Sequence, residues 1–175
     1  LACGVLSGIM FYSLLAAQLL MRPGFDIQHH PITLLALGSG GWVQIVNFLV
    51  SGLLVVLCAG GMKWLLRGKQ GGTWGPLLVG IHGLGLIIAG VFTADPAFGF
   101  PPGAPEGIPT TFSAHAIVHE LGFFVAFIAL TAACFVFARE FFSQKQFHLG
   151  IYSIATGMAA PIVIGISITF QAQNS

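Results

Sequence analysis

The sequence predicts an all-α fold, a polytopic transmembrane helix bundle in which residues 1–175 form a single integral membrane domain. Hydrophobic residues make up 56% of the chain, only 6% of its residues are charged, and its mean hydropathy is +0.93. Soluble domains carry about a quarter charged residues. A helix of about 20 apolar residues crosses a hydrocarbon core of about 30 Å. Five stretches meet that requirement: 2–21, 42–66, 74–93, 112–138 and 147–170.

The first two stretches carry small and polar residues at helical spacing. In 2–21, Gly4 and Gly8 are spaced for close approach of a neighbouring helix. In 42–66, a polar stripe covers about a third of the helix circumference, which predicts either hydrogen bonds to another helix or a cavity wall, and the former is favoured. The stripe consists of Gln44, Asn47, Ser51, Cys58 and Gly61.

The third stretch, 74–93, is rich in glycine, which predicts close contacts with neighbours over most of its surface. His82 lies about 16 Å from its loop end by the rise of a helix. A lone histidine at that depth is more often a hydrogen-bonded packing residue than a ligand, although it could serve as the axial ligand of a haem or pigment.

The fourth stretch, 112–138, opens with His115 and His119, four residues apart on one helix face that continues with small residues. We expect both imidazoles to point into the bundle. Glu120 lies off that face, and an unpaired carboxylate in hydrocarbon is costly, so we expect it to pair with His82. In the fifth stretch, 147–170, a proline at position 161 predicts a kink.

Two loops concentrate the remaining polar chemistry. The loop 22–41 contains His29 and His30, and its segment 31–37 is too short to span and too apolar to be solvated. We expect that segment to lie along the membrane interface or to dip into the bundle. The loop 94–111 contains Asp95 and leads into the two histidines of the fourth stretch.

The distribution of positive charge predicts how the bundle lies in the cell (inner) membrane, because cytoplasmic connections are enriched in lysine and arginine. Five of the six cationic residues flank or occupy the connections after the second and fourth stretches: Lys63, Arg67, Lys69, Arg139 and Lys145. We therefore expect the N-terminus to be cytoplasmic and the loops 22–41 and 94–111 to be exoplasmic.

Composition also narrows the partners. A net charge of +1 without a basic patch argues against nucleic acid, so we expect membrane lipids and other membrane subunits instead. Cys3, Cys58 and Cys134 all lie inside apolar stretches, where cysteine behaves as a small hydrophobic residue, and we expect no disulfide.

Several motifs of the chain resemble an uncharacterised bacterial and archaeal family of multi-pass membrane proteins, domain of unknown function 998. They are His30-Pro31-Ile32 with Leu37-Gly38 and Trp42, the segment from Gly90 to Pro96, Phe100-Pro101-Pro102-Gly103 with Pro105, the segment from His115 to His119, and Tyr152-Ser153 with Ala155-Thr156-Gly157. The resemblance implies a six-helix fold, so a sixth helix would follow Ser175. It implies no particular activity.

Three functions fit these patterns. The preferred one is a non-enzymatic accessory or assembly subunit, or a ligand-binding bundle, whose exoplasmic cap is lined by histidine and aspartate. The first alternative is a zinc-dependent hydrolase that uses His115, His119 and Asp95, with His29 or His30 as a further ligand. The second alternative is a haem- or pigment-ligating subunit that uses His82.

Overall fold

The computed structural model describes residues 1–68 and 71–173, and this part of the chain contains five long helices and one short 3-10 helix. They are α1 (Ala2–Met21), η1 (Ile32–Ala36), α2 (Gly41–Leu65), α3 (Trp74–Val91), α4 (Ala114–Ser143) and α5 (Phe147–Gln173). Each of the five long helices is long and apolar enough to span a membrane. The predicted all-helical fold is confirmed, and the largest change in bounds is at α4, which ends at Ser143 rather than at residue 138.

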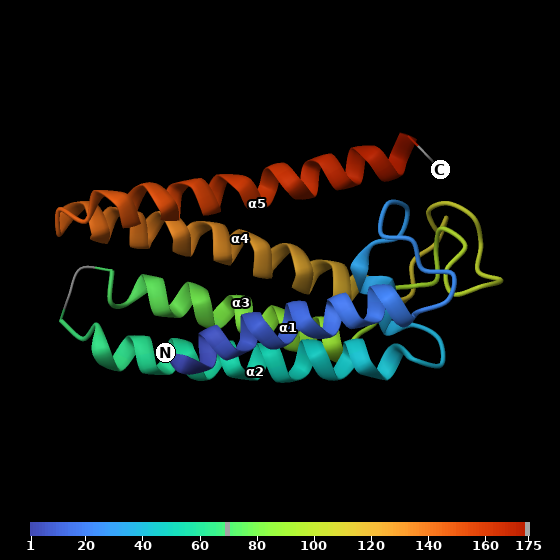
Figure 1. Ribbon diagram of the computed structural model, residues 1–175, viewed down its shortest axis with the longest axis horizontal. Coiled ribbons are helices and arrows are strands. Elements are labelled where there is room, and N and C mark those ends of the chain that lie inside the picture. Colours follow the sequence, from blue (N-terminus) through green and yellow to red (C-terminus); the bar gives the residue numbers. More distant parts are fainter. Residues whose placement is uncertain (69–70, 174–175) are drawn as a thin grey trace.

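The helices run alternately up and down, and each packs against the next one along the chain (Figure 1). α2, α3 and α4 form the middle of the bundle, α1 lies on α2, and α5 forms the outer edge against α4. The two long loops gather at one end of the bundle (Figure 1). We call these loops, residues 22–40 and 92–113, the cap.

Glycines set the spacing of the middle helices. A Cβ atom added to Gly52 of α2 would lie 2.6 Å from the carbonyl oxygen of Gly83 of α3. A Cβ atom added to Gly85 of α3 would lie 2.8 Å from the carbonyl oxygen of Gly122 of α4. The close contacts predicted for the third stretch are therefore confirmed, and they place backbone carbonyl oxygens of one helix against glycines of the next.

The close approach of a neighbouring helix that Gly4 and Gly8 predict is confirmed at Gly4 and wrong at Gly8. A Cβ atom on Gly4 would lie 2.8 Å from Sγ of Cys58 in α2, so this glycine permits close contact. A Cβ atom on Gly8 would meet no described atom within 4 Å. The reason is that α1 faces α2 through Gly4 and Ser7, whose hydroxyl donates to the carbonyl oxygen of Ser51.

The polar stripe of α2 forms hydrogen bonds to α1, as predicted. Gln18 donates to Oε1 of Gln44 at 2.7 Å, and Asn47 donates to the carbonyl oxygen of Phe11 at 3.1 Å. Gln44, Asn47 and Ser51 are completely buried. Each such bond in a membrane contributes about 0.6 kcal/mol.

The predicted faces of α4 are also confirmed. The small residues that point into the bundle are buried, namely Gly122, Ala126, Ala129 and Ala133. The large residues on the opposite side are exposed, namely Ile117, Phe124, Ile128 and Phe135. α5 remains one helix through Pro161. The segment around η1 dips into the bundle, because Leu34 and Leu35 are buried and η1 packs on α2.

Candidate functional site

Asp95 closes the second loop of the cap. Its carboxylate accepts two hydrogen bonds from Ser113, one from the backbone N–H at 2.7 Å and one from the hydroxyl at 2.6 Å. Ser113 is the N-cap of α4, and its Oγ accepts from the N–H of Ala116. The bonds from Ser113 lower the pKa of Asp95, and the charge of His115 lowers this pKa slightly further. Both carboxylate oxygens of this predicted zinc ligand therefore hold the start of α4.

His119 points into the bundle, as predicted, and is completely buried. Its Nδ1 lies 2.8 Å from the carbonyl oxygen of Phe92, so Nδ1 carries the proton and donates. Its Nε2 is buried without a hydrogen-bond partner among the described residues. This imidazole ties α4 to the end of α3.

The prediction that His115 also points into the bundle is wrong, because this side chain is exposed. Its ring lies 5.2 Å from the ring of Phe92. The two histidines share a helix face, but only His119 is covered, because its ring is hydrogen-bonded to Phe92 directly after the end of α3 at Val91. One face of a helix therefore supplies one buried and one exposed imidazole.

The predicted pair of His82 and Glu120 is wrong. Nδ1 of His82 lies 3.1 Å from the carbonyl oxygen of Ala126, to which it donates. Glu120 is exposed. Six residues separate Glu120 from Ala126, which places them about 120° apart around α4 at about 100° per residue. The carboxylate therefore lies outside the contact between α3 and α4.

In the first loop, His30 links the two loops of the cap. Its Nδ1 accepts from the N–H of Asp26 at 2.9 Å, so Nε2 carries the proton and donates to the carbonyl oxygen of Phe98 at 2.9 Å. His29 forms a pair with the Asp26 carboxylate at 2.8 Å, and both side chains are about half exposed. The hydrogen bonds from Gln28 and His29 lower the pKa of Asp26.

The cap also has an apolar centre that sequence reasoning missed. Phe100 is 1% exposed, and its ring packs against those of Phe25 and His30. The Arg22 guanidinium lies 5.6 Å from the Phe100 ring and donates to the carbonyl oxygens of Leu35 and Leu37. The sequence carries no clear signal for this arrangement, because the contacts join residues of two separate loops.

A second missed residue is Glu140, near the opposite end of α4. It is 7% exposed, and Gln144 donates to its Oε1 at 2.5 Å. An Arg-Glu pair at the end of an apolar stretch looks like a solvated helix end in sequence. The structure buries this carboxylate beneath the connection between α2 and α3, where a Cβ atom on Gly71 would lie 3.8 Å from its Oε2.

The predicted zinc ligands form no compact donor set. Across residues 1–68 and 71–173, no three histidine, cysteine, aspartate or glutamate side chains come together as a group that could hold a metal ion. His119 turns its one N–H to the backbone, His115 faces outward, and Asp95 accepts from Ser113. Asp95 and His119 instead form hydrogen bonds with backbone N–H and C=O groups at helix ends.

The helices and the cap together define a multi-pass helical membrane protein with a hydrogen-bonded loop module at one end. Within that class, the chain belongs to the family described as Protein of unknown function (DUF998), whose model matches residues 5–174. No curated protein and no solved structure matches the chain.

Proposed function

We propose that this protein is a non-enzymatic accessory subunit of a membrane assembly and that its cap is a rigid structural module. The observation that carries the proposal is how the polar residues of the cap are used. Asp95 and His30 engage both of their polar atoms with the chain itself, and the N–H of His119 does the same. A catalytic site instead needs acid, base or nucleophile groups directed at a substrate.

The proposal includes an orientation in which the cap is exoplasmic. Lys63 and Arg67 end α2 or follow it, and Arg139 and Lys145 lie at the end of α4, so these cations are at the end of the bundle opposite the cap. Lys69 lies outside the described residues. Positive charge on that side favours a cytoplasmic location for it.

The surface available to partner subunits is the outer side of α5. This helix packs on α4, and most of its described apolar side chains are exposed, including Ile151 and Ile162 at 62% and 54%. Such a surface suits lipid or a partner helix, because both are apolar. A test must therefore distinguish the two.

The test is photo-crosslinking in native membranes from a crosslinker placed at Ile151 or Ile162, with Tyr12 of α1 as the control position because it is 71% exposed and lies on another helix. We expect one protein adduct of defined mass from α5 and none from position 12, together with a stoichiometric complex in mild detergent. Lipid adducts alone, with a monomeric chain, would overturn the accessory role.

A specific observation keeps the zinc hydrolase as a second candidate: Nε2 of His119 is a buried lone pair with no donor among the described residues. Zinc analysis of the purified protein, compared with His119→Ala and with the exposed His148→Ala as control, tests it. A visible absorption spectrum of the same sample tests the haem or pigment alternative at His82. Stoichiometric zinc that is lost only in His119→Ala would favour the hydrolase over the accessory role.

A further inference from the structure

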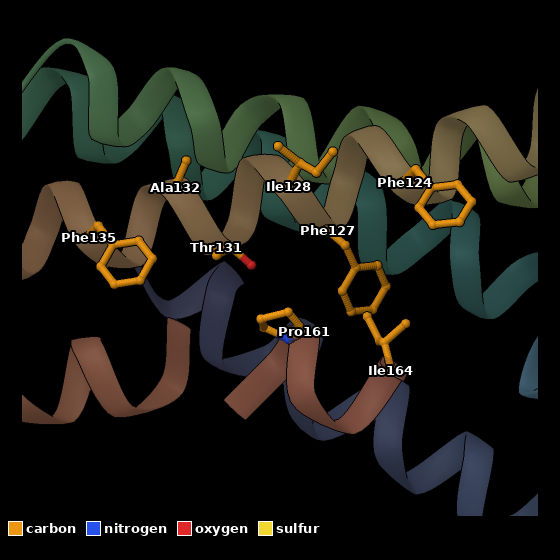
Figure 2. A pocket seen from close by; sticks show the side chains of 8 residues that line it. All are labelled: Phe124, Phe127, Ile128, Thr131, Ala132, Phe135, Pro161 and Ile164. Atoms are coloured by element: carbon orange, nitrogen blue, oxygen red, sulfur yellow. The ribbon is translucent and has the colours of Figure 1, made fainter. Parts of the chain in front are cut away.

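A groove opens between α4 and α5 (Figure 2). Its volume is about 410 Å³. Phe127 of α4 points toward Ile164 of α5, and Thr131 points toward Pro161 (Figure 2). The full lining is Phe124, Phe127, Ile128, Thr131, Ala132, Phe135, Pro161 and Ile164.

The groove has a closed end, away from the cap. There α5 presses on α4, because Cβ atoms on Gly150 and Gly157 would lie 2.6 Å from the Phe142 ring and 2.9 Å from Cys134. Beyond Gly157 the groove runs toward the cap end, along Pro161 and Ile164 (Figure 2). It is therefore a wedge that widens toward one leaflet of the membrane.

A carboxylate lies on the same face of α4, nearer the cap. Glu120 precedes Phe124 by four residues and Phe127 by seven, which is the spacing of one helix face. Long side chains on a helix point toward its N-terminus, and the N-terminus of α4 is at the cap. Glu120 thus lies on the cap side of the groove, and helix geometry favours an exposed side chain that extends toward the cap end.

The depth of Glu120 fits that direction. α4 has 30 residues. Such a helix is about 45 Å long against a hydrocarbon core of about 30 Å, so about five residues at each end lie at headgroup depth. Glu120 follows Ala114 by six residues and lies at this boundary. A carboxylate there reaches both water and the headgroups of neighbouring lipids.

The geometry points to a lipid site: we infer that the α4–α5 groove holds one acyl chain of a membrane lipid whose ammonium headgroup pairs with Glu120. The apolar lining matches a hydrocarbon chain, and the carboxylate attracts a cationic amine and disfavours an anionic headgroup.

The experiment is native mass spectrometry of the whole protein with phosphatidylethanolamine and phosphatidylglycerol of identical acyl chains. We expect the wild type to retain the ethanolamine lipid about fivefold better, the ratio given by an exposed ion pair. Glu120→Gln should abolish the preference while both lipids still bind. The matched control is Glu106→Gln, an exposed carboxylate in the cap, which should leave the preference unchanged.

A second variant tests the groove itself. Ala132→Trp should fill it and lower the retention of both lipids, and the thermal stability of this variant is measured to verify folding. Equal retention of the two lipids by the wild type, or an unchanged preference in Glu120→Gln, would overturn the site. A dimer that dissociates in Ala132→Trp without any change in bound lipid would overturn it in favour of a second protein chain.

Discussion

At the scale of single residues, polar side chains in the cap mainly serve the backbone of their own chain. Asp95 holds Ser113, His30 bridges Asp26 and Phe98, and Arg22 covers Phe100. Loops without regular secondary structure leave many N–H and C=O groups unpaired, and burying them without partners is costly. The concentration of charge and imidazole in the cap is thus explained by the loops it stabilises.

The Asp95 carboxylate should make stability depend on pH. Because hydrogen bonds from Ser113 lower its pKa below 3.8, its contribution is present above that value and is lost as the pH falls through the folded-state pKa. We expect Asp95→Asn to cost about 1 kcal/mol at neutral pH. Thermal unfolding in detergent should show this gap at about pH 6, and the gap should shrink as the pH is lowered below 3.8. A gap that does not change with pH would contradict the role.

The two adjacent histidines should differ in their effect on stability. His30→Ala leaves the N–H of Asp26 and the carbonyl oxygen of Phe98 without partners, and we expect a loss of about 1–3 kcal/mol. His29→Ala removes only an exposed pair and should change stability by less than about 0.5 kcal/mol. Thermal unfolding of both variants tests this, and equal effects would show that His30 does not join the loops.

At the scale of elements, the middle helices depend on small residues at fixed positions. α2, α3 and α4 approach each other where Gly52, Gly83, Gly85 and Gly122 leave no side chain between the backbones. Lipid tails are as apolar as leucine, so close van der Waals contact contributes strongly to helix association in a membrane. This explains why α3 is rich in glycine although glycine lowers helix propensity.

Adding one methyl group at this contact should destabilise the bundle. A Cβ atom on Gly85 would lie 2.4 Å from Cβ of Ala126, so Gly85→Ala should cost about 1–3 kcal/mol through overpacking. Gly60→Ala in α2 is the control, because a Cβ atom there would meet no described atom within 4 Å. Thermal unfolding in the same detergent compares the two. A Gly85→Ala variant as stable as Gly60→Ala would contradict the close contact.

At the scale of the whole molecule, the two ends of the bundle differ in chemistry. The cap holds Arg22 as its cation, while the described cations Lys63, Arg67, Arg139 and Lys145 lie at the other end. This asymmetry is the basis for the proposed orientation, because positive charge favours retention in the cytoplasm.

Cysteine labelling should reveal the orientation directly. In a variant without native cysteines, Thr110→Cys in the cap should react with a membrane-impermeant maleimide in intact cells. Gln144→Cys at the opposite end should react only after the membrane is permeabilised. Both positions are exposed, so their reactivity depends on the side of the membrane. The reverse pattern would invert the orientation.

The amino-acid sequence by itself determined the helices, the small and large faces of α4, and the polar stripe of α2 that bonds to another helix. These properties depend on the period of a helix and on the cost of unpaired polar groups in hydrocarbon, both of which act along one segment. The length of the first predicted stretch agrees with α1 to the residue.

Only the tertiary structure decided the fate of the individual polar groups. His115 and His119 share a face, yet His119 is buried and hydrogen-bonded to Phe92 after the end of α3, while His115 is exposed. Asp95 meets Ser113, His82 meets Ala126, and Glu120 lies on the face that lines the α4–α5 groove. Hydrogen-bond partners depend on where separate segments end and cross in space, and the spacing of residues along one helix carries no information about that.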